Sequence, residues 1–147
     1  MGMYQIAKDK AFLVAVKGIV FNEKGEILVL KVDNKLNDAA KWDFPGGLMD
    51  YNDTVESALK RELQEEIGYT PTEYSVLACS QTEFLNFTFQ EKDTRDVRVV
   101  IIGYKVKFDS SSQIVLSDEH SEYRWVDKSG LLTLPLSRPT KALVESL

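Results

Sequence analysis

The pattern that most constrains this chain runs over residues 54 to 67, where glutamates share the apolar side of a predicted helix. At about 100° per residue, the apolar side chains of this segment fall on one arc that should face a core. They are Val55, Ala58, Leu59, Leu63 and Ile67. Glu62 and Glu66 project into the same arc, about 20° to either side of Val55, and Glu65 stands at its edge.

These glutamates need a counter-charge if the arc is buried. Carboxylates that converge on a partly buried face repel one another and lose hydration, which raises their pKa values or destabilises the fold. A divalent cation is the simplest remedy, and oxygen ligands select hard ions such as Mg²⁺, with Mn²⁺ as a substitute. The pattern therefore predicts a metal site at Glu62, Glu65 and Glu66. The alternative is a solvated acidic face balanced by Lys60 and Arg61.

The ends of the helix are marked in the sequence. Asp53 and Glu56 have the spacing of a capping box, which predicts where the helix begins. Gly68 stands where helices commonly stop in a left-handed conformation. Upstream, residues 42 to 47 predict a short strand that ends in two glycines, without the surroundings of a dinucleotide-binding or Walker-type phosphate loop.

The rest of the chain predicts strands and one closing helix, which makes a mixed sheet flanked by helices the expected architecture. A hairpin is expected over residues 11 to 33 around a turn at 22 to 25, followed by a loop at 33 to 41. Further strands are expected at 74 to 89, 97 to 108 and 123 to 126, with a loop at 90 to 96, and a helix at 140 to 146 opened by Ser137-Arg138-Pro139. We expect one domain spanning residues 1–147.

Charge and composition exclude several classes of protein. The net charge of −5 argues against a broad nucleic-acid surface. The most apolar stretch, residues 11 to 21, is broken by Lys17 and is shorter than the roughly 20 residues that cross a bilayer. The single cysteine, Cys79, allows no intramolecular disulfide and is expected to be a buried, inert thiol. Together with the absence of a secretory pattern, this predicts a cytoplasmic protein.

The segment GGLMDYNDTVESALKRELQEEIGY, residues 46 to 69, resembles the Nudix box. That pattern has a glycine and a glutamate six positions apart, and then R-E-U-x-E-E-x-G-U, where U is a bulky apolar residue. The matching residues are Gly47, Arg61, Glu62, Leu63, Glu65, Glu66, Gly68 and Tyr69. Five fixed residues at about 6% frequency each would coincide at about one start point in a million. Asp53 replaces the first glutamate. We interpret it as a helix cap in preference to a functional carboxylate.

The resemblance implies a MutT-like Nudix hydrolase with an α/β/α sandwich around a mixed sheet. Metal ions would bridge the carboxylates and a pyrophosphate while water attacks phosphorus. The implied metal ligands are Glu62, Glu65 and Glu66, and Arg61 would orient a carboxylate of the box. The loop at Gly46 and Gly47 would bind substrate.

The resemblance also implies an acid in the loop before the last strand. Glu119 is the best match, either as a ligand or general base or simply as an exposed loop acid. His120, the only histidine, disfavours a two-histidine metal site, and we assign it a loop or orienting role.

The implied activity is hydrolysis of the pyrophosphate bond of a nucleoside diphosphate linked to another moiety. The classes left open are nucleoside triphosphates, dinucleoside polyphosphates and nucleotide sugars. The alternative is a catalytically silent Nudix-like domain that senses or binds a nucleotide. The expected partner is a small nucleotide, with no nucleic acid and no membrane. Family members are often dimers, which makes a homodimer a further expectation.

Overall fold

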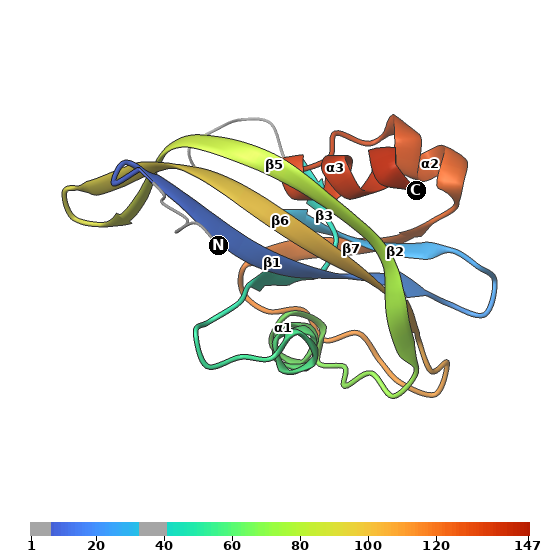
Figure 1. The fold of residues 1–147 in the computed structure, drawn as a ribbon. Helices are drawn as coiled ribbons and strands as arrows, with labels where there is room; N and C mark the ends of the chain where they lie inside the picture. Colours follow the sequence, from blue (N-terminus) through green and yellow to red (C-terminus); the bar gives the residue numbers. More distant parts are fainter. Residues whose placement is uncertain (1–6, 33–40) are drawn as a thin grey trace, which may run out of the picture.

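The computed structural model describes residues 7–32 and 41–147 (Figure 1). The loop expected at 33 to 41 lies outside the described residues, except for Lys41. In chain order the elements are β1 (Lys10–Phe21), β2 (Ile27–Val32), β3 (Lys41–Asp43), β4 (Gly46–Leu48), α1 (Val55–Ile67), β5 (Tyr74–Gln90), β6 (Asp93–Lys107), β7 (His120–Val126), α2 (Lys128–Thr133) and α3 (Arg138–Ser146). None of these helices has the length and apolarity needed to span a membrane.

The sheet is mixed, as predicted. Its main path runs β3-β2-β1-β6-β5, while β4 pairs with β1 and β7 pairs with β2. The β1–β6 ladder is parallel and the other ladders are antiparallel. β1 lies at the centre, and residues 15 to 20 are buried on both faces. A strand covered on both sides explains the long apolar run in the sequence, which Lys17 interrupts.

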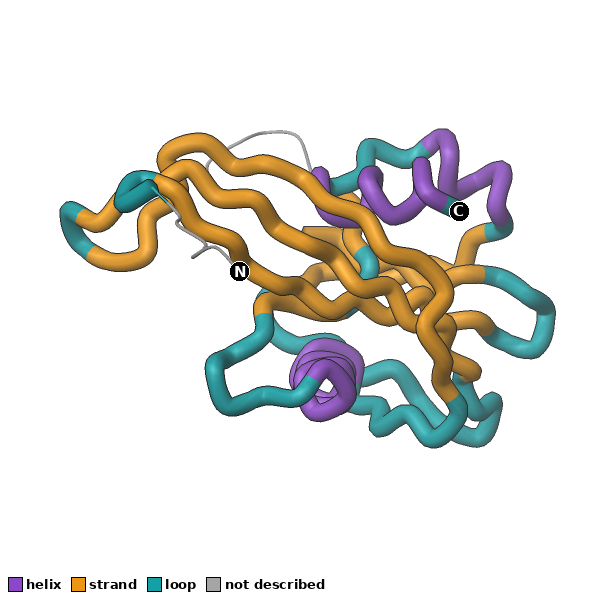
Figure 2. Tube along the Cα trace, viewed as in Figure 1, coloured by secondary structure: helices purple, strands orange, loops and turns teal. Residues whose placement is uncertain are grey.

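Helices cover both faces of this sheet, with α1 on one side and α2 and α3 on the other (Figures 1 and 2). Alternate residues of β1 supply the two cores. Val16 and Val20 pack in the cluster that includes Leu59 and Leu63 of α1. Ala15 and Ile19 belong to the other cluster, which includes Leu131 of α2 and Leu143 of α3. The fold is therefore the expected α/β/α sandwich.

The start of α1 differs from the prediction by one residue. The N-cap is Thr54, whose side chain accepts a hydrogen bond from the Ser57 amide at 3.1 Å, while Ser57 Oγ accepts from the Thr54 amide at 2.9 Å. The predicted capping box of Asp53 and Glu56 was wrong. The predicted stop is confirmed, because Gly68 ends the helix with a φ of 67°.

Three other details depart from the sequence analysis. The loop expected at 90 to 96 is only a two-residue turn, because polar residues 93 to 96 continue the β5–β6 ladder. Cys79 is exposed rather than buried, and it lies on β5, the strand that ends the main path of the sheet. The short helix α2 was not predicted. It begins at the cap Asp127, whose carboxylate accepts from the Gly130 amide at 2.7 Å.

The observed cap makes a prediction about stability. Replacing Thr54 with Ala should lower the free energy of unfolding by about 1 kcal/mol, because the Ser57 amide in the first turn loses the side-chain oxygen to which it donates. Urea unfolding in EDTA measures this change. Thr72→Ala, an exposed threonine outside any helix, is the control and should stay within about 0.5 kcal/mol of wild type. Equal midpoints for both variants would refute the assignment of the cap.

Candidate active site

Side chains of α1 face a cleft of about 410 Å³ that is also bordered by β4 and the loop before β7. Its lining consists of Gly46, Gly47, Glu62, Glu65, Glu66, Ser117 and Glu119. The structure therefore gathers the two predicted glycines, the three helix glutamates and the predicted loop acid in one place. Arg61 does not line the cleft.

The three helix glutamates differ in burial. Glu66 is 8% exposed, Glu62 is half-buried and Glu65 is exposed. This order follows from the packing of α1, whose residues Leu63 and Ile67 are fully buried against the sheet. The helical arc derived from the sequence thus places one glutamate inside the interface and one at its rim.

Two glycines allow α1 to approach the sheet this closely. The Gly46 amide donates to Glu66 Oε2 at 2.9 Å. Gly46 has a φ of 143°, and a Cβ there would lie 2.0 Å from the Val16 carbonyl oxygen. A Cβ on Gly47 would lie 2.7 Å from Glu62 Oε1. Both positions therefore require glycine, the first for its backbone and the second for the carboxylate beside it.

Burial makes two of these carboxylates hold protons unusually well. Burial raises the pKa of Glu66 to about 8, although the charge of Lys17 and the hydrogen bond from Gly46 act in the opposite direction. Burial also raises the pKa of Glu62, opposed by Arg61 and reinforced by Glu65. Such groups favour either a proton or a cation close by.

Arg61 connects the first acid of the motif to the helix. Its Nη2 lies 2.7 Å from Asp53 Oδ2, and its Nη1 lies 3.0 Å from Glu62 Oε1. The hydrogen bond from Arg61 holds the pKa of Asp53 below its usual value. Our interpretation of Asp53 as a helix cap was wrong, because its carboxylate is the partner of Arg61 and Thr54 is the cap. The shorter aspartate reaches the arginine directly.

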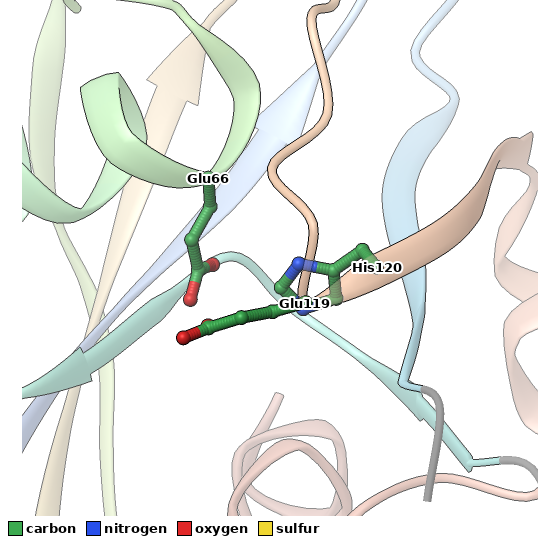
Figure 3. Close-up of side chains that lie close together, drawn as sticks. All are labelled: Glu66, Glu119 and His120. Atoms are coloured by element: carbon green, nitrogen blue, oxygen red, sulfur yellow. The ribbon is translucent and has the colours of Figure 1, made fainter.

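The loop before β7 reaches the site because it is tied to the end of α1. The Ser117 amide donates to the Glu66 carbonyl at 3.1 Å. One possible ligand atom from each of Glu66, Glu119 and His120 lies within 4.8 Å of the others. Figure 3 shows the carboxylates of Glu66 and Glu119 side by side with the imidazole next to them. Ser117 Oγ lies 3.4 Å from His120 Nδ1.

A buried lysine beside the two glycines was missed by the sequence analysis. Lys17 of β1 is 5% exposed, and its Nζ lies 2.9 Å from Asp43 Oδ2. Burial raises the pKa of Asp43, but the charge of Lys17 and a hydrogen bond from Thr140 outweigh it, so the pKa lies below the ordinary value. In the sequence Lys17 only interrupts an apolar run. A single charge within a strand buried on both faces was the signal that could have revealed it.

The donors in the cleft suit a hard divalent cation. They are carboxylate oxygens from several acids. Glu66 is buried, so water can do little to stabilise its negative charge. Mg²⁺ in proteins is held by a few carboxylates together with water and substrate phosphates. The residues present therefore fit the metal that the motif implies.

Comparison with known proteins identifies the family. The chain matches the family described as "NUDIX domain" over residues 11–146. The chain belongs to the Nudix family. Its fold is the Nudix fold, and the glutamates of α1 match those of the Nudix box. Residues of the box line the cleft described above.

Three relatives illustrate the similarity. An 8-oxo-dGTP diphosphatase of Escherichia coli (strain K12) is 40% identical over 75 residues, which cover 51% of this chain and 57% of that protein. An RNA pyrophosphohydrolase of Acinetobacter baylyi (strain ATCC 33305 / BD413 / ADP1) is 34% identical over 119 residues, covering 74% and 69%. The crystal structure of a MutT protein from Methanosarcina mazei Go1 has a TM-score of 0.68 at 26% identity, covering 95% and 94%. The match to the Escherichia coli relative thus spans little more than half of each chain.

The buried glutamate of the Nudix box predicts a dependence of stability on pH. The pKa of Glu66 is raised in the folded chain from 4.5 to about 8. Its contribution to stability is therefore full below about pH 4.5 and is lost as the pH rises through about 8. In EDTA, the free energy of unfolding should fall over this window by up to about 1.4 kcal/mol per pH unit.

The variant Glu66→Gln should remove most of this slope, because the amide stays neutral and can still accept from Gly46. Urea unfolding at a series of pH values measures the slope. The control is Glu145→Gln, which removes one exposed carboxylate from α3 and should leave the slope unchanged. A wild-type curve that stays flat between these pH values would contradict the burial of an ionisable Glu66.

Proposed function

We propose that this chain is a Mg²⁺-dependent pyrophosphohydrolase that cleaves the pyrophosphate bond of a nucleoside diphosphate linked to another moiety. One observation carries the proposal. The buried carboxylate of Glu66, held by the Gly46 amide, meets the carboxylate of Glu119 in a cleft that also receives Glu62 and Glu65. Acids gathered in this way repel one another unless a cation joins them.

The chain's own residues have separate roles in this proposal. Glu62, Glu65 and Glu66 would hold the metal, and Arg61 keeps the Glu62 carboxylate in place through its contact at 3.0 Å. When bound, a divalent cation neutralises charge on phosphate oxygens and lowers the pKa of a coordinated water. Glu119 is exposed at the cleft, so it can accept a proton from the attacking water.

The two glycines are proposed to receive the substrate phosphates. Gly46 and Gly47 line the cleft without side chains, so phosphate oxygens can approach the carboxylates from that side. His120 lies beside Glu66 and Glu119 and is proposed to orient the loop acid.

The names of the relatives and the charge of this chain support the proposed substrate class. One relative is named for 8-oxo-dGTP and another for RNA pyrophosphate hydrolysis. With a net charge of −5, a small nucleotide is the better match than a long polyanion. We therefore place nucleoside triphosphates first, ahead of dinucleoside polyphosphates and nucleotide sugars. A cytoplasmic location, a single domain and a homodimer stay predictions.

The first test is phosphate or pyrophosphate release from a panel of these nucleotides, with Mg²⁺ and then Mn²⁺. Turnover of at least one panel member is expected, and Glu66→Gln should reduce kcat by at least about 100-fold because a metal ligand is lost. EDTA should abolish turnover in wild type. Glu145→Gln, far from the cleft on α3, is the matched control and should keep wild-type kcat.

Two results would count against the hydrolase. Turnover that persists in EDTA would remove the metal from the proposal. Tight binding of one nucleotide without any release of phosphate would favour the alternative, a silent nucleotide-binding domain. The intact set of box carboxylates does not support that alternative.

Gly47 provides a second test of the site. In Gly47→Ala the new Cβ would lie 2.7 Å from Glu62 Oε1, so either the strand or the carboxylate must move. We expect kcat/KM to fall by about 10- to 100-fold. The control Gly25→Ala meets no atom within 4 Å but has a φ of 77°, so it should lower stability and leave kcat/KM unchanged. An active Gly47→Ala enzyme would show that this contact does not position Glu62.

A further inference from the structure

The ammonium of Lys17 is surrounded by one short segment of the chain. It donates to Asp43 Oδ2 at 2.9 Å, to the Phe44 carbonyl at 3.1 Å and to the Gly46 carbonyl at 3.3 Å. A lysine ammonium has three hydrogens, so all of its donors are satisfied. Lys17 also lies opposite Gly46 in the β1–β4 ladder. The segment from Asp43 to Gly46 is therefore folded around a single buried charge.

The counter-ion of Lys17 is anchored on the far side of the same segment. Asp43 Oδ1 accepts from Ser137 Oγ at 2.8 Å and from Thr140 Oγ1 at the start of α3. Thr140 Oγ1 also accepts from the Phe44 amide at 2.9 Å. The segment is thus held between β1 and the first turn of α3. Of the side chains that hold it, Lys17 is nearly buried and Thr140 is fully buried.

Gly46 connects this buried pair to the cleft. Its carbonyl accepts from Lys17, and its amide donates to Glu66 Oε2 at 2.9 Å. Within the described residues, the Gly46 amide is the single hydrogen-bond donor to the Glu66 carboxylate. A shift of the Gly46 backbone would therefore change where that carboxylate points.

We propose that Lys17 is a positioning residue of the active site, which acts through Gly46 to fix the carboxylate of Glu66. It does not line the cleft. The proposal rests on the hydrolase function proposed above, because it assigns Lys17 a part in holding the metal ligands of that reaction. The competing explanation is that Lys17 and Asp43 form a buried ion pair that serves stability alone.

Replacing the pair together separates these explanations. Either Lys17→Met or Asp43→Asn leaves one buried charge without its partner and should lower the unfolding midpoint. The double variant removes both charges, and replacing a buried pair is often neutral for stability. If the pair only stabilises the fold, a double variant with wild-type stability should also have a wild-type site.

Two readouts report on the site without requiring turnover. In metal-free protein, we expect the Gly46 amide proton of the double variant to exchange with deuterium at least about 10-fold faster. The reason is that the Gly46 carbonyl has lost its hydrogen bond from Lys17. The affinity for Mn²⁺, measured by calorimetry, should fall by about 10- to 100-fold. In the panel assay kcat should fall by a similar factor. If wild type turns over nothing, the hydrolase proposal fails, whereas exchange and Mn²⁺ affinity still test Lys17.

The matched control is Lys31→Met combined with Glu122→Gln. This pair lies in the same sheet, with Lys31 Nζ 3.7 Å from Glu122 Oε2, but it is partly exposed and does not line the cleft. Its removal should change neither Gly46 exchange nor Mn²⁺ affinity. A Lys17–Asp43 double variant with wild-type exchange and affinity would overturn the proposal.

A neutral variant covers the case in which the double variant does not fold. Lys17→Gln removes the charge and keeps two amide donors on a side chain one atom shorter than lysine, while Asp43 keeps its hydrogen bonds from Ser137 and Thr140. It should show faster Gly46 exchange and weaker Mn²⁺ binding, by a smaller factor than the double variant. Wild-type values of both in Lys17→Gln would likewise overturn the proposal.

Discussion

The carboxylate of Glu66 is buried where α1 meets the sheet, and the residues around it must compensate this buried charge. A buried carboxylate is costly unless hydrogen bonds and an opposite charge compensate it. Here the Gly46 amide supplies the hydrogen bond, and the charge of Lys17 favours the ionised carboxylate. Both come from the strands that α1 covers. The helix can therefore pack only where those strands present them.

The sandwich architecture turns this local arrangement into a site. β1 lies in the middle of the sheet and is covered on both faces, so it can reach α1 with one set of residues and the layer of α3 with the other. The loop before β7 follows the C-terminal end of α1, because the amides of Val115 and Ser117 donate to carbonyls of Ile67 and Glu66. Glu119 arrives opposite the helix glutamates for that reason.

The parts of this arrangement that were predicted from sequence are those that repeat locally. The period of α1 placed Glu62 and Glu66 in the buried arc, and the strand patterns gave the sheet. Contacts between distant residues were not predictable in this way, since Lys17 meets Asp43 across 26 residues and Asp43 meets Thr140 across 97. The cap was misplaced for a related reason. Asp53 has the right residue type for a cap, but its carboxylate pairs with Arg61 eight residues further along the chain.

The charge of the cleft is the reason why the proposed function includes a cation. Four carboxylates line it, and none of the described residues that line it is basic. Arg61, the nearest arginine in the motif, is already paired with Asp53 and Glu62. A phosphate chain entering this cleft by itself would meet acidic side chains and no basic one among the described lining residues, and repulsion from the ionised acids is unfavourable by several kcal/mol in a partly desolvated site. The proposed function therefore requires substrate and cation to bind together, and it predicts that the affinity for a nucleotide depends on the metal even when Lys17 and Gly46 hold Glu66 in place.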